Sequence, residues 1–239
     1  MKADHWTAED QVALEKEIEA HHLVCGIDEV GRGPIAGPVL ACAIIMPSGS
    51  YIPGVKDSKK LSEKKRESLY DTILSQCLAW GIGMRDAEVI DQINIRQATL
   101  LAMKDALESL HDREGKAVEP DLVLVDAEHV ETDLLQESII KGDDRVYAIS
   151  CASIIAKVTR DRMMIDYGRR FPEYGFCRHK GYGTKAHYEA IEKYGLLPVH
   201  RMSFIHREGL FKHARYQEGI QRFDLSEGGE PGPSGDLAE

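Results

Sequence analysis

Short apolar runs bounded by polar and turn residues mark the strands that this chain should form. The runs 23–30 and 39–46 have the length and residue types of buried strands, and 78–84 and 122–126 are further strand candidates. Apolar residues at helical spacing predict helices over about 8–20, from Ser62 through Leu74, and over about 95–111, 152–167, 186–194 and 207–217. Strand runs come first and then alternate with helices. We therefore expect a mixed α/β fold with a helical C-terminal portion.

The character of the residues divides the chain into three parts. Thr7 resembles the N-cap of a helix with a partial apolar stripe, so residues 1–22 should form a peripheral N-terminal helix. Residues 23–223 carry the strand and helix patterns and should form the main domain. From Asp224 onward, five acids and no bases stand among Gly, Pro and Ser, which predicts an acidic disordered tail over 224–239.

Length and composition indicate one ordinary core. The chain has 239 residues and 43% hydrophobic content, enough to bury a single well-packed core. Its longest apolar run, Val39 to Met46, is too short to cross a bilayer, and the N-terminus lacks the basic start and apolar core of an export signal, so a cytoplasmic protein is expected. Free thiols are expected of the five cysteines, which form no C-x-x-C pair: Cys25, Cys42, Cys77, Cys151 and Cys177.

The net charge of −10 conceals an uneven distribution. From Lys141 to Arg222 there are sixteen Lys and Arg against nine Asp and Glu, a balance of +7. A basic C-terminal third of this kind is able to follow a phosphate backbone, although basic runs more often form plain solvated surface. The acidic total therefore does not exclude a nucleic-acid partner.

The most informative stretch joins two adjacent acids to a glycine-rich turn. Asp28 and Glu29 end an apolar run, where ionised carboxylates are costly unless a cation or hydrogen-bond donors offset their desolvation. The Gly31-Arg32-Gly33 turn that follows lets backbone N–H groups approach a ligand closely and adds a positive charge. The stretch predicts a metal site beside a phosphate site. Taken alone, it is also compatible with a strand that runs out into a solvated turn.

The same glycines do not form a dinucleotide-binding turn. That fingerprint needs G-x-G-x-x-G at the start of a helix. Here Gly31, Gly33 and Gly37 have a different spacing, Pro34 and Pro38 interrupt the segment, and another apolar run follows in place of a helix. A nucleotide-cofactor function is set aside on this ground.

Further acids extend the predicted metal site. Asp126 ends an apolar run as Asp28 does, so the two carboxylates converge if their strands are neighbours in one sheet. Asp143 and Asp144 lie on a polar turn before the next helix. Convergent carboxylates suit Mg²⁺ or Mn²⁺ and, without a His/Cys cluster, do not suit zinc. Two such ions support phosphodiester hydrolysis. Five basic residues are candidates for contacts to the phosphates on either side of the cleaved bond, although each of them taken singly is more often an ordinary surface charge: Lys59, Lys60, Lys157, Arg160 and Lys180.

Six motifs occur along the chain in one order. They are Asp-Glu-Val-Gly-Arg-Gly-Pro at 28–34, Asp-Ser-Lys-Lys-Leu-Ser at 57–62, Asp126, Lys-Gly-Asp at 141–143, Ala-Ser-Ile-Ile-Ala-Lys-Val-Thr-Arg-Asp at 152–161 and His-Lys-Gly-Tyr-Gly-Thr at 179–184. In this order they resemble bacterial ribonuclease HII over about 23–204. Several long motifs in a fixed order are far more specific than any single short pattern.

The resemblance implies a ribonuclease H-like fold, with a central mixed β-sheet flanked by helices and a helical C-terminal portion. The implied activity is cleavage of the RNA strand of RNA–DNA hybrids and of single ribonucleotides embedded in duplex DNA, as in ribonucleotide excision repair, leaving 3′-hydroxyl and 5′-phosphate ends. By motif, the metal-binding catalytic acids are Asp28, Glu29, Asp126 and Asp143, which would hold two Mn²⁺ or Mg²⁺ ions.

The resemblance also implies how the substrate is held. The turn of Gly31, Arg32 and Gly33 would sense the 2′-hydroxyl, and Tyr182 would pack on the sugar at the RNA–DNA junction. Further substrate-binding residues by motif are Ser58, Lys59, Lys60, Ser153, Lys157 and Lys180. A monomer is expected, with a contact to a replication protein through a terminal segment as a further prediction.

Two positions depart from the family pattern, and two other functions stay open. Cys151 stands where alanine is more usual, and Asp144 directly follows Asp143, which occupies the aligned place in Lys-Gly-Asp. One alternative is a non-catalytic protein that binds hybrids; four uncompensated carboxylates beside a phosphate path argue against it. The other is a metal nuclease that acts on DNA junctions, since metal-dependent hydrolysis alone does not distinguish ribose from deoxyribose.

Overall fold

One mixed sheet forms the centre of the protein, and its strand order is β3-β2-β1-β4-β5. The computed structural model describes residues 6–56 and 58–207. The antiparallel pairs are β1 with β2 and β2 with β3, whereas β1 with β4 and β4 with β5 are parallel. The strands are β1 (Val24–Val30), β2 (Val39–Ile45), β3 (Ala79–Arg85), β4 (Leu122–Asp126) and β5 (Gln136–Ile139).

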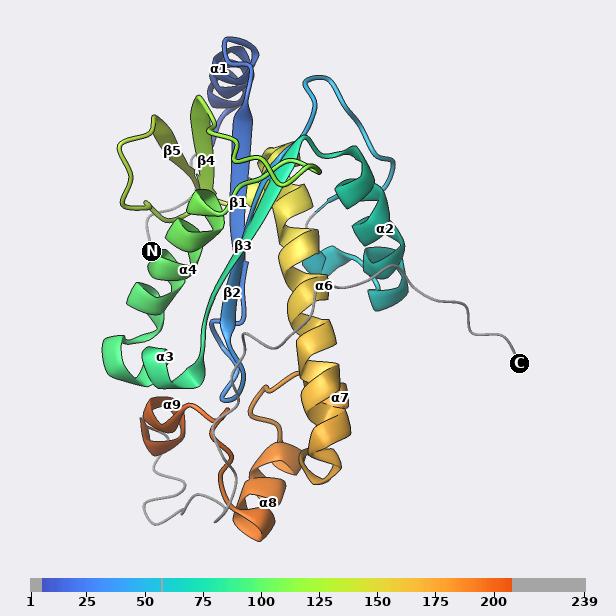
Figure 1. The fold of residues 1–239 in the computed structure, drawn as a ribbon, viewed down its shortest axis with the longest axis vertical. Coiled ribbons are helices and arrows are strands. Elements are labelled where there is room, and N and C mark those ends of the chain that lie inside the picture. Colours follow the sequence, from blue (N-terminus) through green and yellow to red (C-terminus); the bar gives the residue numbers. More distant parts are fainter. Residues whose placement is uncertain (1–5, 57, 208–239) are drawn as a thin grey trace, which may run out of the picture.

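Helices cover both faces of this sheet (Figure 1). The long helix α6 runs along one face with α2 beside it, and α4 covers the other face, as the two main clusters of buried residues confirm. The helices are α1 (Ala8–Glu19), α2 (Glu63–Gln76), α3 (Ala87–Ile93), α4 (Ile95–Glu108), α5 (Gly142–Arg145), α6 (Tyr147–Arg170), α7 (Phe176–His179), α8 (Lys185–Tyr194) and α9 (Met202–Arg207), with short 3₁₀ turns η1 (Ser58–Lys60) and η2 (Pro172–Tyr174).

Alternation along β1 decides which side chains reach which helix layer. Ile27 belongs to the cluster beneath α4, so its neighbours Gly26 and Asp28 face α6. A Cβ on Gly26 would lie 2.4 Å from the main-chain carbon of Ala148, and therefore only glycine lets β1 and α6 approach this closely. This close contact places Asp28 next to the first turns of α6.

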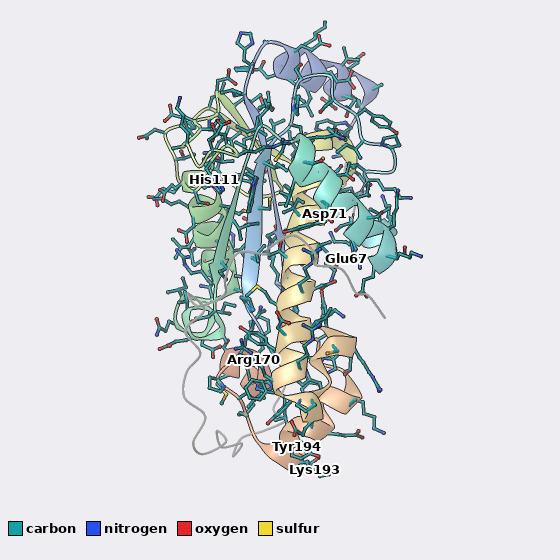
Figure 2. The ribbon with its side chains drawn as sticks, turned by 45° about the vertical axis from the view of Figure 1, so that its right-hand side comes forward. Glu67, Asp71, His111, Arg170, Lys193 and Tyr194 are labelled. Atoms are coloured by element: carbon teal, nitrogen blue, oxygen red, sulfur yellow. The ribbon has the colours of Figure 1, made fainter. Side chains whose placement is uncertain are left out.

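The C-terminal helices form a smaller layer at the far end of α6. Ile35, Met164, Phe176 and Leu197 belong to one buried cluster, which ties α7 and the segments around it to the loop after β1. Figure 2 shows Lys193 and Tyr194 at this end of the molecule, whereas Glu67 and Asp71 on α2 lie beside the middle of α6. Residues 34–38 of the loop after β1 are thus buried against the C-terminal helices, whereas Gly33 is exposed.

The fold class expected from the sequence is confirmed, with local differences. The helix expected from Ala152 begins five residues earlier, at Tyr147. The pattern also misses α3, α5, α7, α9 and β5. The strand β5 is short and lies at the edge of the sheet, with mostly exposed side chains and no apolar run. The acidic tail over 224–239, Asp57 and almost all of the helix expected at 207–217 lie outside the described residues.

The N-terminal helix α1 begins at the expected cap. Thr7 accepts a hydrogen bond from the backbone N–H of Asp10, whose carboxylate accepts one from the backbone N–H of Thr7. Leu14 packs into a buried cluster with Leu122 and Ile139. None of the helices in residues 6–56 and 58–207 combines the length and the apolar character that a bilayer crossing requires.

Candidate active site

Three carboxylates converge at the ends of β1 and β4. The parallel register pairs Ile27 with Val125, so Asp28, which is still paired with β2, lies beside Asp126, the last residue of β4. Asp143 joins them from α5, and the three residues each offer a carboxylate oxygen within 4.8 Å of the others. The convergence predicted for strand-end acids is thus present, and it unites residues that are up to 115 positions apart in the chain.

Local backbone geometry explains how α5 delivers Asp143. Lys141 takes a left-handed conformation with φ 56°, which turns the chain so that the N–H of Gly142 donates to Oδ1 of Asp126 at 2.7 Å. Ser150 Oγ on α6 donates to the main-chain oxygen of Asp143 at 2.7 Å. The main chain at Gly142 and Asp143 is therefore held by hydrogen bonds to Asp126 on β4 and from Ser150 on α6.

Burial makes the acidic cluster electrostatically unfavourable without a cation. Asp28 is 3% exposed, and burial, together with the neighbouring charges of Glu29 and Asp126, raises its pKa well above the usual range. Burial likewise raises the pKa of Glu29 to about 7, although Arg32 and Lys59 oppose the shift. Such carboxylates are satisfied by a divalent cation, and an all-oxygen donor set suits hard ions such as Mg²⁺ or Mn²⁺.

Glu29 and Asp144 occupy different positions from the three clustered acids. Glu29 lies outside the group whose ligand atoms converge, and its Oε1 is 3.8 Å from Nη1 of Arg32. Asp144 forms an ion pair with Lys60 at the surface. The structure therefore separates Asp143 from Asp144, which the Lys-Gly-Asp-Asp sequence leaves ambiguous.

Comparison with known proteins places this site in a family. The family model described as Ribonuclease HII matches residues 25–207. The chain belongs to the ribonuclease HII family. It is 52% identical over 198 residues to ribonuclease HII of Alkaliphilus metalliredigens (strain QYMF), an alignment covering 82% of this chain and 97% of that protein.

Solved structures share the fold of this chain. The ribonuclease H2 from Pyrococcus horikoshii OT3 superposes with a TM-score of 0.67 at 25% identity, covering 79% of this chain and 96% of that one. The PCNA:RNase HII complex from Archaeoglobus fulgidus superposes with a TM-score of 0.63 at 23% identity, covering 79% and 97%. The ribonuclease H-like fold is thus confirmed, and the chain is a metal-dependent endoribonuclease of ribonuclease H type 2.

The turn after β1 lies against the tyrosine predicted to contact the sugar. A Cβ on Gly33 would lie 3.5 Å from Cε1 of Tyr182, so the turn and the ring are close neighbours, and Tyr182 is 47% exposed. Gly31 has φ +92°, and a Cβ there would meet Nε of Arg160 at 2.3 Å. The glycine turn after β1 and the Tyr182 loop are therefore neighbours in the folded chain.

Arg32 is oriented by a residue that sequence reasoning missed. Its Nη1 lies 3.0 Å from Oε1 of Glu128, and Nη2 of Arg96 lies 3.3 Å from the other oxygen of that carboxylate. Glu128 stands two residues beyond Asp126, on the loop that leaves β4. Its position in the sequence could have predicted this role, since an acid just beyond the end of a strand that carries a catalytic acid faces the same edge of the sheet.

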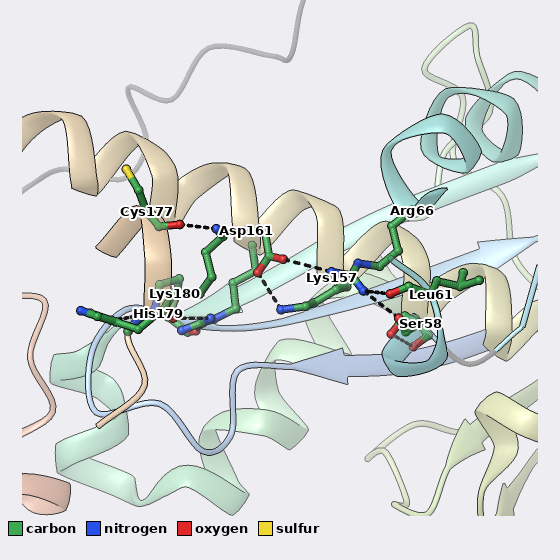
Figure 3. A network of polar contacts seen from close by, with 12 residues as sticks. Ser58, Leu61, Arg66, Lys157, Asp161, Cys177, His179 and Lys180 are labelled. Carbon is green, nitrogen blue, oxygen red and sulfur yellow. Dashed lines mark hydrogen bonds and ion pairs between the residues drawn. The ribbon is translucent and has the colours of Figure 1, made fainter. Parts of the chain in front are cut away.

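The predicted phosphate-contacting residues fall into two groups. Lys59 and Lys60 are exposed, and each also faces an acid, Asp143 and Asp144 respectively. Lys157 instead pairs with Asp161 at 2.7 Å within a network that includes Arg66 and η1 (Figure 3).

The remaining predicted contacts include one correction. Ser58 Oγ and Ser153 Oγ are 2.8 Å apart and buried, and Ser153 also hydrogen-bonds Asp28. Lys180 Nζ donates to the main-chain oxygen of Cys177. Arg160 is 0% exposed, so its prediction as a surface phosphate contact is wrong: its side chain is covered by the loop after β1 and by the segment at Lys180, whose main-chain oxygens accept its hydrogen bonds.

Three histidines lie behind the Tyr182 loop, two of them joined by a hydrogen bond and the third stacked on its neighbour. His200 Nδ1 accepts from the N–H of Leu197 at 2.8 Å, so its Nε2 carries the proton and donates to His187 Nε2 at 3.1 Å. His187 Nδ1 then donates to the main-chain oxygen of Tyr182 at 2.9 Å. The His179 ring stacks on His187 at 4.3 Å. Burial lowers the pKa of His187 to about 4 and that of His200 to about 3, which keeps both rings neutral.

Proposed function

We propose that this chain hydrolyses the RNA strand of RNA–DNA hybrids and cuts at single ribonucleotides embedded in duplex DNA, leaving 3′-hydroxyl and 5′-phosphate ends. The observation that carries the proposal is a juxtaposition at the end of β1. Asp28 belongs to the carboxylate cluster, and the glycine turn that faces Tyr182 begins three residues later. The cluster supports phosphodiester hydrolysis, and the turn with its tyrosine supports selection of ribose.

The clustered acids Asp28, Asp126 and Asp143 would hold the metal, with Glu29 as a fourth ligand. Two Mg²⁺ or Mn²⁺ ions, when bound, would activate a water and stabilise the leaving oxygen of the phosphodiester. The chain itself supplies the negative charge that retains the ions. It also supplies the rigid placement of those carboxylates by β1, β4 and α5.

Ribose selection would come from the turn and the ring beside it. The 2′-hydroxyl is the group by which a protein distinguishes RNA from DNA, and backbone N–H groups of a glycine turn are able to donate to it. The half-exposed ring of Tyr182 offers a flat apolar surface to the sugar at the junction. Exposed cations such as Lys59 and Lys60 would contact flanking phosphates, which position the duplex without reading its bases.

The cellular role proposed here is removal of ribonucleotides from DNA by a monomer in the cytoplasm. The Archaeoglobus fulgidus protein is described in a complex with PCNA, which is compatible with a replication-protein contact in this chain as well. We assign that contact to a terminal segment; the acidic C-terminal tail over 224–239 lies outside the described residues.

The deciding experiment incubates the protein and Mg²⁺ with a DNA duplex that contains one ribonucleotide, beside an all-DNA duplex of the same sequence. We expect cleavage of the ribonucleotide strand alone. Cleavage of both duplexes would point to a DNA nuclease. Binding without cleavage of either would point to a hybrid-binding protein, and each of these results would overturn the proposal.

A further inference from the structure

Two arginines are completely buried behind the turn that follows β1. Arg160 on α6 and Arg201, just before α9, are both 0% exposed. Within the described residues neither guanidinium forms an ion pair with a carboxylate, and every hydrogen bond that they donate goes to a main-chain oxygen. A buried charge is unfavourable unless hydrogen bonds satisfy it. Moving one of these main-chain oxygens would leave a buried guanidinium without a partner, so the contacts fix the position of the backbone as well as that of the arginines.

Arg160 joins two loops that are far apart in the sequence. Its Nε donates to the oxygen of Pro38 at 2.8 Å, and its Nη2 donates to that of Ala36 at 3.1 Å. Its Nη1 donates to the oxygen of Lys180 at 3.0 Å, two residues before Tyr182. One planar group thus fixes the loop after β1 relative to the tyrosine loop.

Arg201 orients the glycine turn itself. Its Nη2 donates to the oxygen of Gly31 at 2.7 Å, and its Nη1 donates to that of Arg32 at 3.2 Å. No peptide bond in the described residues is cis, and in a trans peptide the C=O and the following N–H point in opposite directions. The N–H groups of Arg32 and Gly33 are therefore turned away from the buried arginine. In the described part of the chain they have no hydrogen-bond partner of their own.

Backbone contacts complete the connection between the two loops. The N–H groups of Ile35 and Ala36 both donate to the oxygen of Gly181, at 2.9 and 3.2 Å. Gly181 has φ +87°, and a Cβ there would lie 2.3 Å from the oxygen of Ala36. Only glycine permits this approach, so the turn and the tyrosine loop form one unit that the two arginines hold from behind.

We propose that Arg160 and Arg201 are positioning residues for ribose recognition: they hold the carbonyls of the turn inward and thereby aim its free N–H groups at the 2′-hydroxyl. Arg160 also sets the separation between that turn and Tyr182. The inference rests on the proposed function, because it assumes that the turn and Tyr182 contact the ribose. In this proposal neither arginine touches substrate or metal. The planar guanidinium is required in addition to the positive charge, because it donates several hydrogen bonds in fixed directions.

The test compares Arg160→Lys and Arg201→Lys with the unaltered protein, because lysine keeps the charge and loses the fork. We would measure kcat/KM on a duplex with one ribonucleotide, and the inhibition constant Ki of an all-DNA duplex of the same sequence as competitor. We expect kcat/KM to fall about tenfold to a hundredfold through misplacement of the turn. Ki should change by less than about twofold, because phosphate contacts determine it. The matched control is Arg162→Lys, at a residue of the same helix whose partner is Glu67 at the surface, and both constants should stay unchanged.

Each result has one meaning. Unchanged kcat/KM in the folded lysine variants would overturn the inference, and so would equal changes in both constants, which indicate a merely structural role. Failure of the unaltered protein to prefer the ribonucleotide duplex would instead refute the proposed function. If circular dichroism shows that the lysine variants do not fold, Gly181→Ala serves in their place. It forces the two loops apart while keeping both arginines, and it should lower kcat/KM without changing Ki. Normal kcat/KM in folded Gly181→Ala would contradict the inference.

Discussion

The ammonium nitrogen of Lys59 lies 3.3 Å from Oδ2 of Asp143, so a cation of the protein already faces one of the three clustered carboxylates. The Lys59 side chain is 78% exposed, whereas that of Asp143 is 9% exposed. The lysine therefore partly offsets the charge of a buried acid from a position that solvent and substrate both reach.

Replacing Lys59 by Met should strengthen binding of a divalent ion. Its ammonium competes electrostatically with the metal for Asp143, and loss of an exposed pair of this kind corresponds to an increase in Mn²⁺ affinity of about two- to fivefold. Titration calorimetry without nucleic acid would measure this affinity. Lys64→Met on the exposed side of α2 is the control, and an equal gain there would indicate a general charge effect.

Replacing Asp28 by Asn should abolish cleavage and leave hybrid binding in place. The substitution removes a metal ligand and keeps the phosphate contacts, so we expect at least about a thousandfold fall in kcat. Because the buried carboxylate is unfavourable without metal, the variant should be at least as stable as the parent to unfolding in EDTA. Cleavage assays and hybrid-binding titrations measure the two effects. Retained turnover at saturating Mg²⁺ would remove Asp28 from the metal site.

Replacing Asp143 should lower kcat far more than replacing its neighbour Asp144. Asp143 contributes to the carboxylate cluster, whereas Asp144 pairs with Lys60 at the surface. Asp143→Asn should therefore lower kcat at least about a hundredfold, and Asp144→Asn should change it less than about threefold. Steady-state cleavage at fixed Mg²⁺ distinguishes the two. A reversed order would mean that Asp144 reaches the metal in the complex.

Replacing Tyr182 by Ala should reduce cleavage at the junction without unfolding the protein. The half-exposed ring contributes little to the core, so the free energy of unfolding should change by less than about 1 kcal/mol. Tyr182→Phe keeps the ring and should retain most of the activity. Cleavage rates and urea unfolding of both variants test this, and a large stability loss in Tyr182→Ala would show a structural role.

Acid should destabilise the protein through the buried histidines. The pKa values of His187 and His200 are about 4 and about 3 in the folded state, below the ordinary 6.5. Between pH 6.5 and about 4 the unfolded chain binds protons that the folded chain does not. The contribution of the two neutral histidines to the free energy of unfolding is therefore complete above pH 6.5. It is lost as pH falls, by up to about 1.4 kcal/mol per pH unit for each histidine.

Urea unfolding between pH 7 and pH 4 would measure this slope. His200→Gln should make it shallower by about one proton, whereas His129→Gln at the surface should leave it unchanged. An identical slope in the parent and in His200→Gln would mean that His200 does not contribute.

Local patterns were sufficient to predict most of the sheet and the position of its acids. An apolar run that stops at Asp28 or Asp126 specifies a buried strand with a carboxylate at or near its end, since strand formation and burial both follow from neighbouring residues; β4 ends at Asp126, and β1 continues two residues past Asp28. The motifs at 28–34 and 179–184 likewise indicated ribonuclease HII, which the family comparison confirms. The edge strand β5 lacked a signal because its side chains are mostly exposed.

By itself, the sequence determined the fold class, the family and the residue types of a metal site. Only the tertiary structure decided that Asp144 pairs with Lys60 at the surface, that Lys157 pairs with Asp161, and that Arg160 lies inside the protein. The physical reason is that ion pairing and burial depend on which distant segments pack together. An arginine on α6 has the same local sequence whether it faces solvent or the carbonyls of a loop more than a hundred residues away.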